Sequence, residues 1–280
     1  MRTRTCTIGL ALILTLWGTG RAQTDTSRWV FFPSRTLFAP LMANHEEPRM
    51  GIQQEIGTSN MKVAIGNSVD AFEYHTGIDT IRCSLMFFVY ALANDYRGYR
   101  LKIDAADGFF GFGFNYHTRS PWSFRFRALH LSAHLVDGHY NDAIEQWRDN
   151  KIPFPFSRNY GEIVAAYATG ISRCPLRLYA GTSYAPIVKP KDIRGWAGIA
   201  GWELQTPGSI HAYLAHHFLL LGAPTYIGTN TVESGVKFGG DSGRGIRLFL
   251  MYQNGWDNFG EYYNERNEFF GAGFAVEFWE

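Results

Sequence analysis

The chain has few charged residues, few cysteines and no long apolar run beyond its first residues, and each shortage excludes a class of protein. Only 18% of its 280 residues are charged, which excludes a disordered chain and a helical coiled coil. After the N-terminal leader, no run approaches the roughly 18 apolar residues that a membrane-spanning helix needs. Any crossing of a membrane must therefore use strands.

Residues 1–22 have the plan of a secretory signal peptide. Arg2 and Arg4 precede an apolar stretch from Cys6 to Trp17, and Gly20-Arg21-Ala22 is a small-residue cleavage site. A single membrane anchor is the alternative, for which the apolar stretch is short. Removing the three arginines of this leader leaves 23 basic residues against 25 acidic ones, so the charge balance gives no argument for nucleic acid binding.

Cysteine is scarce after the leader. Only Cys83 and Cys174 remain, and they form neither a metal-ligand motif nor a disulfide framework. Two interpretations stay open, a disulfide formed in an oxidising compartment and two buried apolar side chains. We expect no metal and no cofactor.

From about residue 61 the chain alternates apolar and polar residues with period two, which is typical of strands. In the last segment Phe270, Phe274 and Phe278 share one face, while Gly271 and Glu277 lie on the other. Charged residues at strand centres suit a polar barrel lumen or, alternatively, the solvent face of a soluble secreted sheet. The predicted lumen charge network comprises Lys102, Asp104, Arg125, Arg127, Glu162, Arg177, Glu203, Glu233, Lys237, Arg247 and Glu277.

These segments predict an all-β fold, a transmembrane antiparallel β-barrel of about twelve strands. They cover residues 61–74, 80–93, 97–105, 109–117, 122–136, 160–172, 175–186, 195–206, 210–220, 225–238, 244–254 and 268–279. Tight connections such as Asn94 to Tyr96 fall at even positions, whereas the long ones (137–159, 187–194 and 255–267) fall at odd positions. Single-chain outer-membrane barrels have an even strand number and sort short periplasmic turns from longer loops in this way.

Residues 23–60 have no clear period and contain Pro33, Pro40 and Pro48. In a flexible tether, the aromatic and apolar residues of this stretch would have to stay in contact with water. We therefore expect an irregular periplasmic lead-in or partial plug that packs on or partly into the barrel. The barrel itself is expected to occupy residues 61–280.

Several ordered motifs resemble those of one family. They are Thr36 to Arg49, Asn94-Asp95-Tyr96, His130 to His134 with Asp137, Leu176 to Gly181, Gly235 to Phe238 and Tyr262 to Phe274. Together they resemble an uncharacterised bacterial family of outer-membrane barrels that is known only as a domain of unknown function. The resemblance implies a place in the outer membrane of a Gram-negative cell envelope, but no activity and no catalytic residue. The chain departs from the family at Ala43-Asn44-His45-Glu46-Glu47-Pro48-Arg49 and at its last residue, Glu280.

The fifth predicted strand changes phase. Phe126 lies on one face and Leu129 on the other, so a β-bulge near Arg127 and Ala128 is the simplest way to keep the apolar residues together. The bulge is expected to turn the three polar residues of the following stretch toward the lumen.

Those residues, His130, Ser132 and His134, form with Asp137 the candidate catalytic group. Residues at i, i+2 and i+4 share a strand face, and the His–Ser spacing is similar to that of barrel lipid A deacylases, in which an acid completes the site. Asp137 and Glu145 are the candidate acids. The two histidines lie about 13 Å apart on an extended strand, too far to share one metal ion. A hydrogen-bonded lumen cluster is the alternative to catalysis.

The predicted lumen network has six positive and five negative residues. This near balance favours a narrow or closed, salt-bridged interior over a strongly selective pore. We therefore predict a narrow or gated channel or a structural barrel. Two alternatives are a lipid-acting hydrolase that uses His130 and Ser132, and a surface-binding barrel that acts through its long extracellular loops. The expected partners are outer-membrane lipid and the barrel-assembly machinery, with no nucleic acid and an unknown substrate.

Overall fold

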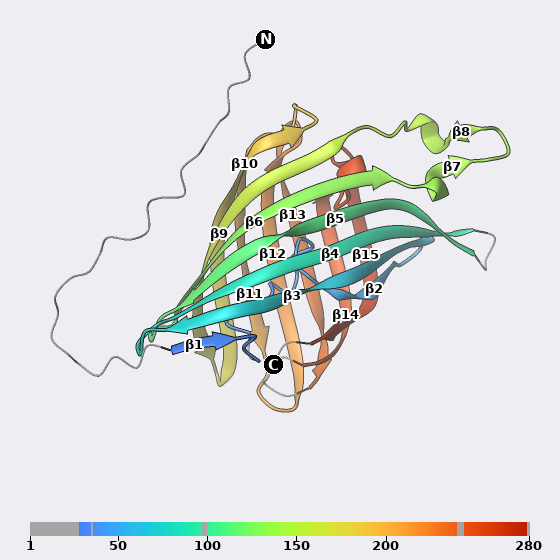
Figure 1. The fold of residues 1–280 in the computed structure, drawn as a ribbon. Coiled ribbons are helices and arrows are strands. Elements are labelled where there is room, and N and C mark those ends of the chain that lie inside the picture. The colour runs from blue at the N-terminus through green and yellow to red at the C-terminus, as the bar shows by residue number, and fades with distance from the viewer. Residues whose placement is uncertain (1–27, 35, 97–99, 240–243, 279–280) are drawn as a thin grey trace, which may run out of the picture.

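Twelve antiparallel strands close into one barrel in a computed structural model (Figure 1). The structure describes residues 28–34, 36–96, 100–239 and 244–278, and the expected signal peptide lies outside them. The barrel strands are β2 (Met50–Glu55), β3 (Asn60–His75), β4 (Thr80–Tyr96), β5 (Arg100–His117), β6 (Trp122–Leu135), β9 (Phe156–Ile171), β10 (Cys174–Lys189), β11 (Trp196–Gln205), β12 (Ile210–Gly222), β13 (Tyr226–Phe238), β14 (Gly245–Trp256) and β15 (Arg266–Glu277). The sheet closes because β2 pairs with β3 on one side and with β15 on the other.

The all-β barrel of twelve strands is confirmed, but two of the predicted boundaries are wrong. β2 lies within the segment expected to be an irregular lead-in, and its sequence Met-Gly-Ile-Gln-Gln-Glu is too short and polar to show an alternating pattern. The strands predicted at 97–105 and 109–117 are one strand, β5. Asp107-Gly108 is a frequent turn sequence, yet the backbone continues through it because both β4 and β6 pair with these residues.

The connections separate the two ends of the barrel. One end, named here the loop end, carries the long connections 136–155 and 257–265, together with 56–59, 190–195 and 223–225. The other end, named the turn end, carries 76–79, 118–121, 172–173 and 206–209. The connection predicted at Asn94 to Tyr96 is wrong, since these residues are the last three of β4, at the loop end rather than the turn end because β5 is one strand rather than two.

Small elements decorate both ends. β1 (Arg28–Phe31) pairs with the turn-end part of β3. The hairpin of β7 (Tyr140–Asn141) and β8 (Gln146–Trp147) projects from the loop end (Figure 1). The single-turn helices are η1 (Asp137–His139), η2 (Arg148–Asn150) and η3 (Gly260–Tyr262). Within the described ranges, no helix has the length and apolar character to cross a membrane.

The outer face of the barrel carries large apolar side chains at alternate positions of neighbouring strands. Phe87 on β4, Leu250 on β14 and Phe270 on β15 are 67%, 60% and 62% exposed. Further exposed apolar side chains are Ile65, Leu85, Phe110, Phe112, Phe114, Phe124, Phe126, Ile163, Leu178, Leu248 and Phe274. Soluble monomers rarely expose apolar patches of more than a few hundred Å², so this face is suited to contact with lipid.

The interior changes character along the barrel axis. Toward the loop end it is an apolar core, in which the rings of Phe88 and Phe109 stack with centroids 4.5 Å apart. Toward the turn end it is charged. The inner face of β6 shows both zones, since Arg125 and Arg127 are followed by the buried Leu129 and by further buried aliphatic residues toward the loop end.

The β-bulge predicted in β6 is wrong. The pairing of β6 with β5 and with β9 runs without a register shift. The strand keeps one phase because the interior itself changes from charged to apolar, so arginine and leucine share the inner face. His130, Ser132 and His134 consequently lie on the outer face, together with Phe126.

The two cysteines are free thiols. Cys83 is buried on β4, and Cys174 is partly exposed at the start of β10. Of the two interpretations that the sequence leaves open, the disulfide is not formed in this structure.

Candidate functional site

The chain that precedes β2 occupies the charged part of the lumen. Residues 36–49, named here the plug, run inside the barrel (Figure 1). Phe38 and Leu41 are buried against apolar side chains of β9, β10, β11 and β12. The lead-in therefore enters the barrel rather than packing only on its outside.

Glu47 of the plug binds the arginines of β6. Arg125 donates from both terminal nitrogens to the Glu47 carboxylate, at 2.9 and 2.5 Å. Arg127 lies 3.5 Å from the same carboxylate and also donates to the backbone carbonyl of Glu46 at 2.8 Å. On the wall itself, Glu162 of β9 accepts from Arg127 at 2.8 and 2.7 Å and from Arg125 at 3.1 Å. Buried charges require such pairing and hydrogen bonding.

Glu46 of the plug binds the loop-end part of β9. Its two carboxylate oxygens accept from Arg158 at 3.1 Å and from the Tyr160 hydroxyl at 2.9 Å. The side chain of Asn44 shapes the turn that presents both carboxylates, because its oxygen accepts the Glu46 backbone N–H at 2.9 Å and its amide donates to Glu47 at 3.3 Å. This is the local bond by which asparagine stabilises turns.

The wall formed by β10 to β15 holds the plug by the one arginine of the plug and by the plug backbone. Arg49 lies 3.3 Å from the Glu233 carboxylate of β13. Glu203 of β11 accepts the Met42 backbone N–H at 2.7 Å, and Arg177 of β10 donates to plug carbonyls at 2.8 and 3.0 Å. Burial, and secondarily the Lys62 ammonium, lower the pKa of His45 well below its ordinary value, so the imidazole is neutral at pH 7 and the plug carries its charge on Glu46, Glu47 and Arg49.

Most of the charges predicted to face the lumen are buried, whereas Lys102, Arg177 and Glu277 are partly exposed. The buried ones are Asp104, Arg125, Arg127, Glu162, Glu203, Glu233, Lys237 and Arg247. No pattern in the sequence indicated the role of Glu46 and Glu47, although they stand where the chain departs from the family pattern. Arg158 is absent from the predicted network because it falls at the end of a stretch predicted as a loop.

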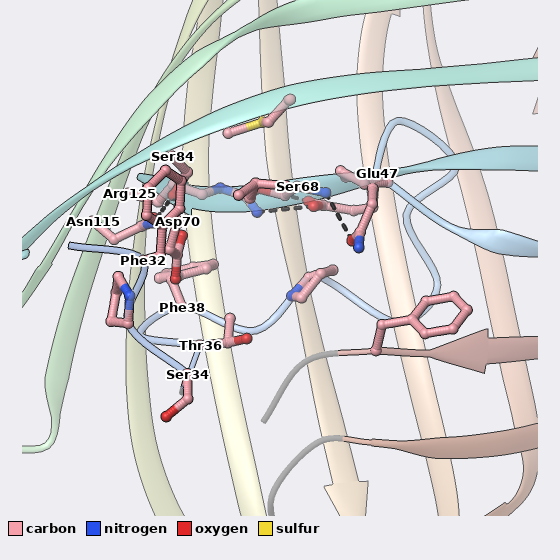
Figure 2. A pocket seen from close by; sticks show the side chains of 17 residues that line it. Phe32, Ser34, Thr36, Phe38, Glu47, Ser68, Asp70, Ser84, Asn115 and Arg125 are labelled. Carbon is pink, nitrogen blue, oxygen red and sulfur yellow. Dashed lines mark hydrogen bonds and ion pairs between the residues drawn. The ribbon is translucent and has the colours of Figure 1, made fainter. Parts of the chain in front are cut away.

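Two cavities flank the plug. One of about 310 Å³ lies between the plug and the β10–β15 wall, where Arg177, Glu203, Lys237, Arg247 and Glu277 line it. The other, of about 190 Å³, lies between the plug and strands β3 to β5 (Figure 2). In the second cavity the Ser84 hydroxyl donates to Asp70 at 2.5 Å and accepts from Asn115 at 2.9 Å. Both cavities are large enough for water and small solutes.

A second segment covers the loop end. Residues 257–265, named here the lid, place Phe259 in the apolar core. The Gly260 backbone N–H donates to Asp107 of β5 at 2.9 Å. The lid also meets the long loop 136–155, since Lys151 pairs with Glu265. The plug thus occupies the charged part of the lumen, and the lid packs on the apolar part at the loop end.

Asp104 binds both segments of the loop end, the lid and the loop 136–155, and is not part of the charged half of the lumen. It accepts the Tyr262 hydroxyl of the lid, lies 2.9 Å from His139 Nδ1 and accepts from Arg148 at 2.8 Å. His139 is buried, and no pattern in the sequence distinguished it.

The candidate catalytic residues lie on the outer face of β6. The Ser132 hydroxyl oxygen is 2.9 Å from His134 Nε2. His130 bonds instead to Asn159 of β9 at 2.6 Å, so the histidine beside the serine is not the one expected. Asp137 is exposed in η1, and among the described residues no acidic side chain is recorded bonding to His134. Within the residues that the structure describes, no group of three ligating side chains is placed to hold a metal ion.

Comparison with known proteins gives a family and a structural likeness. A family model described as "Protein of unknown function (DUF1207)" matches residues 104–278. No curated protein matches the chain. Among solved structures, the chain is similar to the beta domain of the Bordetella autotransporter Brka, with 10% identity, a TM-score of 0.41, and coverage of 81% of this chain and 95% of that one.

Proposed function

The chain belongs to this family of unknown function, and we propose that it is a gated outer-membrane pore that its own plug and lid close at rest. The apolar outer face supports placement in lipid. The sorting of long and short connections supports an orientation in which the loop end faces outward and the turn end, with the plug, faces the periplasm.

The plug carries this proposal. A structural barrel needs only wall side chains to fill its interior, whereas this lumen is filled by a separate segment held largely by ion pairs. The ion pairs of Glu47 with Arg125 and of Arg49 with Glu233 are close to two cavities. Water that enters these cavities can solvate the charges when the plug leaves, which lowers the penalty of separating them.

The test is conductance across a planar bilayer, with the protein refolded in detergent. Four proteins are compared: the natural chain, the plug variant Glu46→Gln/Glu47→Gln, the lid variant Gly260→Ala, and the variant that combines them. Gly108→Ala is the matched control for the lid change, because a methyl group there meets only one ordinary contact, with Ser132 O at 3.9 Å. A folded barrel is verified for each by circular dichroism.

We expect the natural chain and Gly108→Ala to be silent and the combined variant to show stable current steps. Current steps in the natural chain as large as those of the combined variant would contradict closure at rest. Silence of the combined variant, with its fold intact, would contradict a gated pore and would favour a structural barrel.

The bond between Ser132 and His134 favours a second candidate function, hydrolysis of an ester in an outer-membrane lipid. The pair lies on the lipid-facing side of β6, near the loop end, where a lipid headgroup can reach it. A histidine that accepts the serine proton activates the hydroxyl as a nucleophile. Release of fatty acid from lipid vesicles, lost in Ser132→Ala and retained in His130→Ala, would support this function, and no release by the natural chain would contradict it.

A further inference from the structure

The wall formed by β6 and β9 carries more positive charge than it can neutralise by itself. Its inner face carries three buried guanidinium groups, those of Arg125, Arg127 and Arg158, and one buried carboxylate, that of Glu162, which pairs with Arg125 and Arg127. The Glu162 carboxylate accepts two hydrogen bonds from Arg127 and one from Arg125. Both terminal nitrogens of Arg125 and one of Arg158 donate to the plug.

The wall formed by β10 to β15 differs. There Arg177 pairs with Glu203, and Arg247 lies between Glu233 and Glu277. This wall therefore supplies a carboxylate for each of its positive groups, counting Lys237 with Glu277. The β6–β9 wall, by contrast, depends on the plug for neutrality.

The plug supplies the two missing carboxylates. Glu47 receives the paired nitrogens of Arg125, and Glu46 receives Arg158 together with the Tyr160 hydroxyl. Planar guanidinium groups bind carboxylate and phosphate in this paired manner. The Nε atoms of Arg125 and Arg158 are buried without a partner among the described residues, so the site retains unused donor capacity even with the plug in place.

We propose that Arg125, Arg127 and Arg158, with Tyr160, form an anion-binding site of the pore. In the closed barrel the carboxylates of the plug occupy it. When the plug is out, a solute that carries carboxylate or phosphate oxygens takes their place, and the pore passes anions in preference to cations. This inference rests on the proposed gated pore for its transport consequence but not for its binding consequence.

Binding is tested first, because it does not require an open pore. In Glu46→Ala/Glu47→Ala the two carboxylates are removed while the arginines remain. We expect calorimetry to detect binding of inorganic phosphate or of succinate by this folded variant in detergent, and the stronger of the two identifies the preferred oxyanion. The natural chain should bind neither at submillimolar concentration, because a tethered segment competes at an effective concentration on the order of millimolar or above.

The location of the site is tested by a further change in the same background. Arg158→Gln removes the guanidinium that Glu162 does not satisfy and should weaken binding about tenfold or more. The matched control is Arg82→Gln on β4, a buried arginine that pairs with Asp70 and Glu73 and not with the plug, which should leave the affinity unchanged.

Selectivity is tested in the combined plug and lid variant, from the reversal potential in a potassium chloride gradient. We expect chloride to pass several times more readily than potassium, since the unpaired arginines of the β6–β9 wall give that part of the lumen an excess of positive charge, which raises the local concentration of anions.

The outcomes separate this inference from the gated pore. Absence of phosphate and succinate binding by folded Glu46→Ala/Glu47→Ala overturns the anion site, and so does equal weakening by Arg158→Gln and Arg82→Gln. Current with a preference for potassium overturns the selectivity while leaving the pore intact. A silent pore in a variant that binds phosphate overturns the gated pore and leaves the anion site standing.

Discussion

The Glu47 carboxylate receives both terminal nitrogens of Arg125, at 2.9 and 2.5 Å, and thereby joins two segments 78 residues apart in the chain. One segment is the inner face of a barrel strand, and the other is the plug. Both side chains are buried, with 2% and 4% of their surface exposed. The contact therefore links the position of the plug to a buried charge pair in which each group is the closest partner of the other.

We predict that this pair governs how firmly the plug is seated. Glu47→Gln and Arg125→Gln should each weaken docking of the plug by about 3 kcal/mol, because each removes the closest partner of a buried charge. The double variant should lose clearly less than the sum of the two. Amide hydrogen exchange of Met42 and Asn44, whose N–H groups are bonded in the docked plug, measures the free energy of opening. Strictly additive effects would contradict direct coupling.

Gly260 allows the lid to approach the apolar core. A Cβ atom there would lie 2.6 Å from Ala133 Cβ and 2.6 Å from Phe156 Cε1. Gly260→Ala should therefore displace the lid and weaken its docking by about 1 to 3 kcal/mol, as overpacking does elsewhere. Exchange protection of the Tyr262 and Glu265 amides should fall accordingly. The lid's protection should stay unchanged in Gly108→Ala, and a loss of equal size there would assign the effect to general damage.

The lid should be less stable at neutral than at mildly acid pH. Burial raises the pKa of Asp257 from its ordinary value of 3.8 to about 6, against the hydrogen bonds it accepts from the Phe259 backbone and from Asn267. The docked lid thus binds a proton more tightly than the open lid, so its stability falls as pH rises from about 4 to about 6 and is constant above that. Protection factors of lid amides measure this, and Asp257→Asn should reduce the slope, while Glu261, whose carboxyl pKa burial also raises, retains the rest. Protection that rises over this interval would refute the assignment.

Placement in lipid predicts a dependence on depth along one strand. Leu250 and Asn254 both lie on the outer face of β14, with Asn254 closer to the loop end. Leu250→Arg should destabilise the barrel in lipid bilayers by about 2 to 4 kcal/mol, whereas Asn254→Arg should change its stability by at most about 1 kcal/mol. Reversible unfolding by urea in vesicles gives both values. Equal effects at the two positions would argue against a membrane boundary between them.

The sequence by itself determined the barrel. Alternation of apolar and polar residues is a local property, so it showed the long strands β3, β4, β6 and β9 to β15 directly. The alternation also placed the two long connections, which end at residues 155 and 265, at the same end of the barrel. It failed for β2, whose six residues are too few and too polar to alternate visibly, and for Asp107-Gly108, where a sequence common in turns lies inside a strand.

Only the tertiary structure decided what fills the lumen. On β6, Arg127 and Leu129 share one inner face because the interior passes from charged to apolar, a difference that depends on which distant residues line each level. The plug lies inside because its Glu46 and Glu47 neutralise arginines that follow them by 78 residues or more. Pairing over such separations depends on how the closed barrel brings the strands together, and no local pattern in the chain records it.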